Sequence, residues 1–343
     1  MHFIFIIKKN RLMAKKNVAV VLGGSSGEYE ISVKSGLEVS QAIDSRKYNV
    51  YPIIIRGKDW YYKPTAKERI NVDKNDFSIT IAGEKIVFHA IFNAIHGTPG
   101  EDGKLQGYFD TLNIPYTSCN HEVSAITFHK GFCNMVVRAL EMDDLKVSDS
   151  VLLTSDELID NNAVMKKIGL PCFVKPVQSG SSVGVSKVKK AEDLPVAMEA
   201  AFEVCHEIMV ERFVKGRELT CAVSHLKGVV KAFPVAEIVS KKEFFDLEAK
   251  YDSRLNQEII PAPISETLTK RIQTNSKILF QHLRCKGIVR FDYIVTAQEE
   301  IYFLEVNTIP GMTSESIMPK MLQSEGISTM EFYTTMVDEV IGG

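Results

Sequence analysis

The stretch 303–316, FLEVNTIPGMTSES, contains two side chains whose types and spacing could bind a metal ion. Glu305 and Asn307 are two residues apart, and residues at that spacing on a strand point to the same face. Their neighbours are largely apolar, as in a buried strand. A carboxylate and a carboxamide on a buried face cost free energy unless another group pairs with them. The identity of that partner decides what the segment does.

A second predicted strand, GIVRFDYIV, lies just upstream and offers the partner. If Thr296 pairs with Ile301, the residues between them, AQEE, form a four-residue hairpin loop, which is a common length. This register places Asp292 opposite Glu305. It also places Arg290 opposite Asn307, so that all four side chains share one face.

Two directly opposed carboxylates repel each other, and a divalent cation between them would remove that penalty. Ligands that are all oxygen atoms favour Mg²⁺ or Mn²⁺ over Zn²⁺, and substrate phosphates usually complete such sites. The alternative is a local ion pair between Arg290 and Asp292 on a solvated strand face.

The loop 178–184, QSGSSVG, is the predicted partner of the phosphates. Its glycines allow a close approach of the backbone, and Ser181 and Ser182 supply hydroxyl and N–H groups for an anion. Lys175 on the preceding strand adds a positive charge. The sequence contains no G-x-x-x-x-G-K-[ST], so this is not the helix-capping P-loop.

Composition limits the class of protein. A chain of 343 residues predicts two or three domains, and its net charge of −2 gives no sign of a nucleic-acid or membrane-surface partner. The cysteines form no C-x-x-C, which favours reduced thiols in a cytoplasmic protein. The longest apolar runs are too short to cross a bilayer.

The first residues, MHFIFIIKKNRLMAKK, do not have the order or length of a signal peptide. We expect residues 1–13 to be an extra N-terminal segment, and a strand pattern begins only at Asn17. The hypothesis is that translation begins at Met13 and that residues 1–12 are either disordered or not translated.

The first third of the chain alternates apolar strands with helical patterns, which predicts a parallel sheet covered on both faces. The expected strands are NVAVVLGG, YNVYPIII, KIVFHAIFNAIHG and IPYTS, with helices at 31–43 and 104–113.

The remainder contains adjacent strands as well as alternating ones, which predicts antiparallel sheets in an α+β arrangement. Helices are expected at 124–140, 190–205, 266–284 and the C-terminus, and strands at 170–188 around the serine loop, 207–214, 217–225, 229–239 and 287–307. The polar stretch 240–262 is predicted to be a long loop, of the kind that often forms a lid.

These motifs, taken in order, resemble those of the D-alanine–D-alanine ligases, a family of the ATP-grasp superfamily. The resemblance runs from about Asn17 to the C-terminus and rests on LGGSSGEYEIS, HGTPGEDGKLQG, FVKPVQSGSSVGVSKV, ERFVKGRELT, EAKYD, VRFDY and LEVNTIPGMTSES. It implies an N-terminal Rossmann-like domain with a parallel sheet at 14–118. A two-lobed ATP-grasp fold follows, with a central lobe at 119–210 and a C-terminal lobe at 211–343.

The resemblance also implies the reaction. ATP would activate one D-alanine as D-alanyl phosphate, and a second D-alanine would attack it to give D-alanyl-D-alanine for peptidoglycan synthesis. It further implies a cytoplasmic homodimer.

The resemblance assigns residues to ATP and to the metal. The ATP-binding residues would be Lys130, Lys175, Ser181, Ser182, Glu211, Arg212, Val214, Glu218 and Lys250. Arg212 departs from the lysine often found at its position, so its backbone role carries over more firmly than its side-chain role. Asp292, Glu305 and Asn307 would hold two ions of Mg²⁺ or Mn²⁺.

A second set of residues would bind and activate the amino acids. Glu28 would hold the first ammonium group, although an acidic residue there could simply favour the following helix N-terminus. Tyr251 on the lid would close onto Ser181, which in turn would meet Glu28. The remaining members are Arg290 and the Gly311 N–H at the oxyanion, and Ser316 and His96 on the substrate side.

Three alternatives stay open. A ligase of the same fold could use D-lactate or D-serine as its second substrate, although Tyr251 favours D-alanine. Another ATP-grasp enzyme, such as a carboxylase subunit, would lack HGTPGEDGKLQG. A non-catalytic nucleotide-binding module would not need Arg290 together with the three metal ligands.

Overall fold

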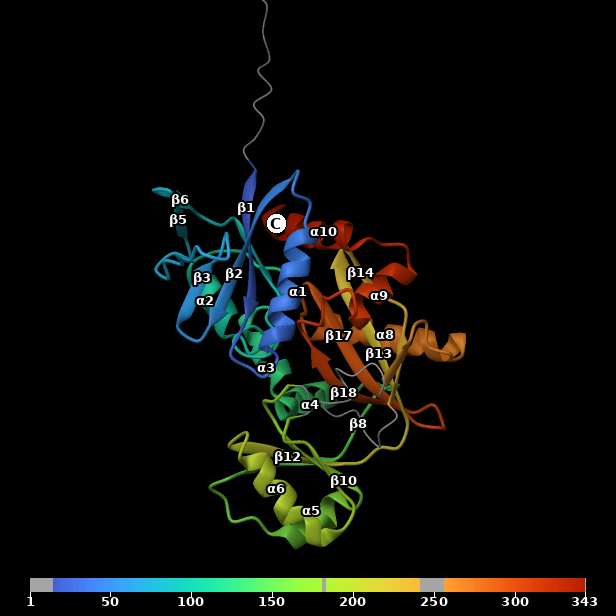
Figure 1. The fold of residues 1–343 in the computed structure, drawn as a ribbon. Helices are drawn as coiled ribbons and strands as arrows, with labels where there is room; N and C mark the ends of the chain where they lie inside the picture. The colour runs from blue at the N-terminus through green and yellow to red at the C-terminus, as the bar shows by residue number, and fades with distance from the viewer. Residues whose placement is uncertain (1–14, 181–182, 241–255, 343) are drawn as a thin grey trace, which may run out of the picture.

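The computed structural model describes residues 15–180, 183–240 and 256–342, which form three main sheets and one small hairpin (Figure 1). The predicted N-terminal segment 1–13 lies outside the described residues. So do Ser181, Ser182, Lys250 and Tyr251 and most of the predicted lid.

The first sheet is built around a strand that is buried except at its first two residues. Its strands lie in the order β4 (Ile70–Asn71), β3 (Asp59–Tyr62), β2 (Tyr48–Arg56), β1 (Lys16–Gly23) and β7 (Ala90–Asn93). β1 runs parallel to both β2 and β7, as predicted. β3 and β4 pair antiparallel, so the predicted parallel sheet is correct only for the central strands. Helix α1 (Tyr29–Ala42) follows β1 and packs against it.

Two predicted strands of this region differ in the structure. The run KIVFHAIFNAIHG divides: its first residues form β6 (Glu84–Ile86), which pairs with β5 (Ile79–Ile81) in a separate hairpin. The segment IPYTS makes only a single bridge, between Tyr116 and Ile91. An apolar run does not reveal where its backbone leaves the sheet, so both errors follow from the lack of turn signals. Helix α2 (Lys104–Thr111) confirms its prediction.

The second sheet is antiparallel and forms the lower lobe in Figure 1. Its order is β11 (Ser186–Val188), β10 (Cys172–Pro176), β12 (Glu207–Arg212) and β9 (Ser150–Thr154). Helices α5 (Asn161–Ile168) and α6 (Leu194–Phe202) pack with it around a core of their own. The sheet thus presents the serine loop, which joins β10 to β11, at one end of a compact lobe.

The helix predicted at 124–140 is two helices, α3 (His121–Phe128) and α4 (Lys130–Ala139). The chain breaks at His129, whose backbone is extended and whose Nδ1 accepts a hydrogen bond from the Phe132 N–H at 3.2 Å. A side chain that accepts from the third residue of a helix is an N-cap. The break places Lys130 at the first position of α4.

The third sheet carries most of the predicted site. Its order is β16 (Asn256–Ile259), β15 (Ala236–Ser240), β13 (Arg217–Leu226), β17 (Ile288–Val295), β18 (Ile301–Asn307) and β8 (Lys146–Val147), and β14 (Val229–Ala232) pairs with β13. All pairs are antiparallel except β18 with β8. Two predictions need correction: the strand at 229–239 divides into β14 and β15, and part of the predicted loop 240–262 is β16.

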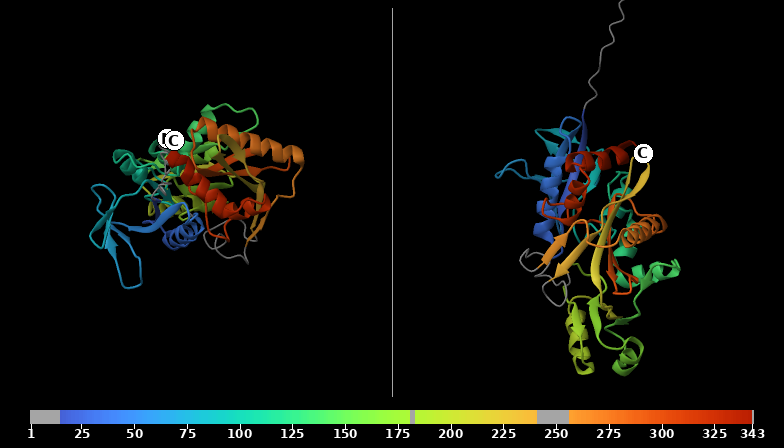
Figure 2. Two further views of the ribbon diagram at one scale, coloured as in Figure 1. Left: turned by 90° about the horizontal axis from the view of Figure 1, so that it is seen from above. Right: turned by 90° about the vertical axis from the view of Figure 1, so that its right-hand side faces the viewer.

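Helices join the first and third sheets. Helix α8 (Glu266–His282) confirms the helix predicted at 266–284, and it packs on the third sheet. The C-terminal helices α9 (Ile317–Ser324) and α10 (Thr329–Gly342) lie between the two sheets, and α10 contacts α1 and β7 (Figure 2). A shared apolar core runs from β1 through α10 to the third sheet. None of the helices that the structure describes has the length and apolar character needed to cross a membrane.

Two helical glycines make this packing testable. A Cβ added at Gly36 on α1 would lie under 3.0 Å from the buried Leu22 side chain on β1, whereas one at Gly107 on α2 would be 4.0 Å from its nearest neighbour, His121. We expect Gly36→Ala to lower the free energy of unfolding by about 1–3 kcal/mol through overpacking. The matched Gly107→Ala should raise it by about 0.5–1 kcal/mol, because Ala favours a helix.

Urea unfolding of both variants measures the difference. Equal effects of the two substitutions would show that the contact between α1 and β1 is not as tight as the structure has it.

Candidate active site

The register of β17 and β18 confirms the predicted juxtaposition. Asp292 pairs with Glu305, and Arg290 pairs with Asn307. The hairpin end differs from the prediction, because Val295 rather than Thr296 is opposite Ile301. A β-bulge beside Asp292 absorbs the difference of one residue. Bulges commonly re-aim side chains next to active sites, and this one returns the four polar residues to the predicted register.

Asp292 is buried, with 2% of its surface exposed, and each of its oxygens accepts two hydrogen bonds. Arg290 donates to both of them at 2.8 Å, from Nε and Nη2. The Thr220 hydroxyl donates at 2.6 Å and the Asn307 amide at 2.9 Å. The alternative interpretation is therefore correct that Arg290 and Asp292 form an ion pair. It is wrong that the pair lies on a solvated face, because Asp292 is buried. Burial alone would lower the pKa of Arg290, but the charge and hydrogen bonds of Asp292, together with the charges of Glu305 and Glu218, outweigh it and the pKa is raised.

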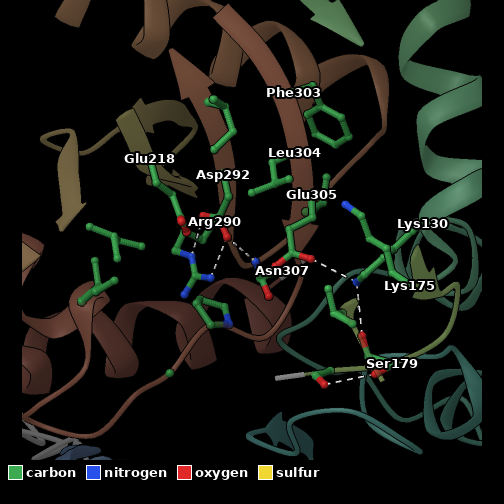
Figure 3. A pocket seen from close by; sticks show the side chains of 18 of the residues that line it. Lys130, Lys175, Ser179, Glu218, Arg290, Asp292, Phe303, Leu304, Glu305 and Asn307 are labelled. Atoms are coloured by element: carbon green, nitrogen blue, oxygen red, sulfur yellow. Dashed lines mark hydrogen bonds and ion pairs between the residues drawn. The ribbon is translucent and has the colours of Figure 1, made fainter. Parts of the chain in front are cut away.

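Glu305 is paired with a cation from a different part of the fold. The Lys130 ammonium, at the start of α4, donates to Glu305 Oε2 at 3.0 Å and to the Ser179 carbonyl at 3.2 Å. Figure 3 shows this lysine between the carboxylate of the third sheet and the serine loop of the second. Burial lowers its pKa and Glu305 raises it, with a net increase. Each of the two opposed carboxylates therefore has its own cationic partner.

The central lobe contains a buried ion pair. Lys175 Nζ lies 2.5 Å from Glu211 Oε2, and the Asn134 amide on α4 donates to Glu211 Oε1 at 3.2 Å. Both charged side chains are less than a tenth exposed. The predicted phosphate lysines, Lys130 and Lys175, are thus both held in place by carboxylates.

One cavity of about 1360 Å³ collects the predicted residues. Such a volume exceeds the usual range for a single small ligand, so a nucleotide and a small substrate could occupy it together. Every predicted site residue that the structure describes lines the cavity, namely Glu28, His96, Lys130, Lys175, Glu211, Arg212, Val214, Glu218, Arg290, Asp292, Glu305, Asn307, Gly311 and Ser316. Ser181, Ser182, Lys250 and Tyr251 lie outside the described residues.

The donor set fits a hard divalent cation, because opposed Asp292 and Glu305 and the carboxamide of Asn307 offer oxygen atoms at one end of the cavity. Within the described ranges, no three His, Cys, Asp or Glu side chains form a metal-binding group. The third predicted ligand, Asn307, is an asparagine and so does not belong to those four residue types. Metal binding by these three residues therefore stays a prediction.

Glu28 lies where the first and second sheets meet. A Cβ placed on Gly180 of the serine loop would be 2.5 Å from Glu28 Oε2, so only glycine allows this approach. Glu28 occupies the N-cap position of α1, but its side chain makes no capping hydrogen bond. The simpler interpretation, in which it serves only the helix, therefore has no capping contact to support it.

His96 has both ring nitrogens engaged. Nδ1 lies 2.8 Å from the Ile309 carbonyl and Nε2 lies 3.0 Å from the Ser35 hydroxyl. Because a carbonyl only accepts, Nδ1 carries the proton and Nε2 accepts from Ser35. Burial lowers the pKa of the imidazole, although Glu28 opposes this in part. The neutral ring thus joins the first sheet to the segment after β18, and its predicted substrate role stays a prediction.

The turn after β18 also has a close internal contact. A Cβ at Gly311 would lie 2.7 Å from the Ser316 hydroxyl oxygen, so the two predicted oxyanion and substrate groups are neighbours. The Ser316 hydroxyl also lies 2.8 Å from that of Thr313.

Comparisons with known proteins agree with this arrangement. Family models described as D-ala D-ala ligase N-terminus and C-terminus match residues 17–119 and 140–341. The chain is 43% identical to the D-alanine–D-alanine ligase of Flavobacterium johnsoniae and 42% identical to that of Bacteroides fragilis. Each alignment covers 94% of this chain, and 98% and 99% of those relatives.

The chain belongs to the D-alanine–D-alanine ligase family.

Solved structures share the whole fold. D-alanyl-alanine synthetase A from Vibrio cholerae superposes with a TM-score of 0.86 at 28% identity, covering 96% of this chain and all of that one, 100%. The VanG D-Ala:D-Ser ligase from Enterococcus faecalis gives a TM-score of 0.83 at 32% identity, covering 94% of this chain and 99% of that one. The predicted combination of a Rossmann-like domain with an ATP-grasp fold is confirmed.

Within this ligase fold, the Arg212 side chain is bound to the end of helix α5. Its guanidinium donates to the carbonyls of Ile168 and Lys167, at 2.9 and 3.2 Å, at the C-terminal end of α5. Cations are favourable at that end of a helix. The predicted contribution of Arg212 through its backbone is compatible with this, since its side chain has a structural role.

The sequence interpretation missed four residues that hold the ligase site together. They are Thr220, which donates to Asp292; Asn134, which donates to Glu211; His129, which caps α4; and Glu101. Asn134 could have been noticed as a polar residue in an apolar helix. Glu101 lies inside the motif HGTPGEDGKLQG, but its partners are distant in sequence.

Glu101 is a carboxylate that accepts from two backbone N–H groups, Gly97 at 2.7 Å and Ile309 at 3.1 Å. Burial and the charges of Glu28 and Glu305 raise its pKa from 4.5 to about 7, against the effect of its hydrogen bonds. The folded ligase therefore keeps this proton up to a higher pH than the unfolded chain does.

That difference predicts a pH dependence of stability. Between pH 4.5 and about 7 the unfolded chain has lost the Glu101 proton and the folded chain retains it, so stability falls as pH rises through this window. The loss should be about 3 kcal/mol and complete above pH 7. Glu101→Gln removes the titration, so its stability should fall less between pH 5 and 8.

Urea unfolding of both proteins at each pH, with a chelator present, provides the measurement. Parallel stability curves would mean that Glu101 titrates normally.

Proposed function

We propose that the protein joins two D-alanine molecules into D-alanyl-D-alanine at the expense of ATP, through D-alanyl phosphate, in the synthesis of peptidoglycan precursors. The supporting observation is the single cavity at which fourteen predicted residues from three sheets meet. The curated relatives that carry the name of this activity align over nearly the whole chain.

The cavity is arranged to receive a triphosphate between the lobes. Lys130 and Lys175 place ammonium groups near the serine loop, each now paired with a carboxylate. Phosphate oxygens would compete for these charges, and Glu211, Val214 and Glu218 would bind the nucleoside end of ATP. Because carboxylates react poorly with amines, transfer of the γ-phosphate to the first D-alanine makes the mixed anhydride that the next step needs. This step depends mainly on positioning and neutralisation of charge.

Asp292, Glu305 and Asn307 would hold the divalent cations, Mg²⁺ or Mn²⁺, with two ions as the proposed number. When bound, these ions neutralise the phosphate charge. The chain itself supplies the opposed carboxylates that such ions require, and the buried Arg290 keeps Asp292 oriented.

The second step requires stabilisation of a developing oxyanion. The amine of the second D-alanine attacks the acyl carbon, its proton is released, and inorganic phosphate leaves. Arg290 and the Gly311 N–H are proposed to stabilise the tetrahedral oxyanion, and Glu28 to hold the first ammonium group. His96 and Ser316 are proposed on the side of the substrate.

Further predictions extend this function. We infer a domain division at residues 118 and 210, a homodimer and a cytoplasmic location. The roles of Ser181, Ser182, Lys250 and Tyr251 at the phosphates and the lid also remain predictions.

A second candidate is a ligase that takes D-serine or D-lactate as its second substrate. One observation favours it, namely the similarity to the VanG D-Ala:D-Ser ligase. The greater identity to relatives named D-alanine–D-alanine ligase supports the first candidate.

A competition assay decides between them. Purified protein with ATP and Mg²⁺ receives D-alanine alone, and then D-alanine with D-serine or D-lactate, and the products are identified by mass spectrometry. We expect D-alanyl-D-alanine as the main product in every mixture. A dominant mixed product would favour the second candidate, and phosphate release that ignores D-alanine would contradict both.

Asp292→Asn tests the metal ligands. The variant should lose ligation by at least ~10³-fold, since it removes one of two carboxylates from the cation site. It should also lower the free energy of unfolding by about 3 kcal/mol, because the buried Arg290 loses its charged partner. Turnover at saturating Mg²⁺ and urea unfolding measure the two effects.

The matched control is Asp144→Asn. Asp144 also pairs with an arginine through both of its oxygens, Arg271, but away from the cavity and with 40% of its side chain exposed. Full activity in this control is expected, and activity retained by Asp292→Asn would argue against metal binding there.

A further inference from the structure

Ile309, in the segment between β18 and α9, is held on both sides of its backbone by one loop of the N-terminal region. Its N–H donates to Glu101 Oε1 at 3.1 Å, and its carbonyl accepts from His96 Nδ1 at 2.8 Å. Both partners are more than 200 residues away in sequence, at separations of 208 and 213. Two hydrogen bonds on opposite sides of one residue fix both its position and its orientation.

The two side chains are themselves fixed. The second oxygen of Glu101 accepts from the Gly97 N–H at 2.7 Å, and the second nitrogen of His96 meets Ser35 at 3.0 Å. The backbone N–H of His96 also donates to the Ser32 hydroxyl at 2.9 Å. Helix α1 and the loop after β7 thus support both sides of the contact, which we call the Ile309 clamp, formed by Glu101 and His96.

The clamped residue stands between two parts of the proposed machinery. Asn307, a proposed metal ligand, precedes Ile309 by two residues, and Gly311, a proposed oxyanion donor, follows it by two. A shift of about 1 Å in a positioned group can cost a large factor in rate. The position of Ile309 therefore limits how Gly311 can be placed relative to the nucleotide end of the cavity.

We propose that Glu101 is a positioning residue that, with His96, fixes the turn at Ile309 and thereby the Gly311 N–H for the second step. This rests on the proposed function, which it deepens by assigning a role to a carboxylate outside the predicted site. Glu101 acts through the backbone of Ile309 and does not touch the reacting atoms.

The chemistry of the side chain supports this role. The two oxygens of the Glu101 carboxyl group accept one backbone N–H each. Glutamine would place its own amide hydrogens against one of those N–H groups. Glu101 lies near two other carboxylates, Glu28 and Glu305, where a negative charge is unfavourable. If the side chain at position 101 only filled space, an uncharged side chain there would make the fold more stable than Glu101 does.

Hydrogen exchange tests the clamp directly. In Glu101→Gln, the Ile309 amide should exchange at least ~10-fold faster than in wild type, because its acceptor is weakened or displaced. Glu101→Asp provides a second variant that keeps the carboxyl group but is one methylene too short to reach both N–H groups. It should show the same increase at Ile309, and so serves if the glutamine variant folds poorly.

Kinetics provides the second measurement. The variants should lose ~10- to 100-fold in kcat for D-alanyl-D-alanine, while the Kd for ATP, from calorimetry, stays within ~2-fold of wild type. A general loss of folding would instead weaken ATP binding as well.

The matched control is Asp102→Asn, in the same loop. Among the described residues, the hydrogen bonds and ion pair of the Asp102 carboxylate go to Thr98 and Lys104, and none of them reaches the segment after β18. It should leave Ile309 exchange and kcat near wild type.

The outcomes separate the proposals. Unchanged exchange at Ile309 in both Glu101 variants would overturn the clamp, as would an equal effect of Asp102→Asn. If wild type makes no D-alanyl-D-alanine, the proposed function fails, whereas the exchange experiment still decides whether the clamp exists.

Discussion

The charge balance between two opposed carboxylates organises this molecule. Asp292 and Glu305 face each other on adjacent strands, and each is neutralised by a different cation. Arg290 belongs to the same strand as Asp292, so its contribution is local. Lys130 comes from α4, so the balance at Glu305 depends on how the helix and the serine loop sit against the third sheet. The proposed nucleotide site therefore depends on an electrostatic contact between lobes, in addition to packing.

A short break in a helix makes that contact possible. The apolar pattern of 124–140 continues across His129, which is why a single helix was predicted there. The structure ends α3 before His129 and begins α4 after it, and the imidazole caps the new helix while Nε2 lies 3.1 Å from Glu207 on β12. Periodicity reports which face of a helix is buried, but it does not report a change of direction. Lys130 could be named from the sequence, whereas its position at a helix start could not.

Local pairing was predictable and distant pairing was not. The alternation of side chains along β17 and β18 was enough to bring Asp292 opposite Glu305, although the bulge that restores this register was not visible in the residues. β6 and β16 were missed because an apolar run and a polar loop do not specify where a strand ends. The contacts of Glu101 with Ile309 and of Asn134 with Glu211 join separate elements, and no spacing rule predicts such pairs.

The site carries more charge than stability alone would favour. Burial raises the pKa of Glu101 at the junction of the sheets, and the negative charges of Glu28 and Glu305 raise it further. Like charges close together in a partly buried site lower the free energy of unfolding, so a fold selected only for stability would replace one of them. Each of the three instead meets a group that the proposed reaction needs: the serine loop through Gly180, the turn before Gly311, and Lys130. The repulsion is thus a consequence of bringing the first and third sheets together: Glu28 and Glu101 follow strands of the first sheet, Glu305 lies on β18 of the third, and each lies against a neighbouring backbone or cation.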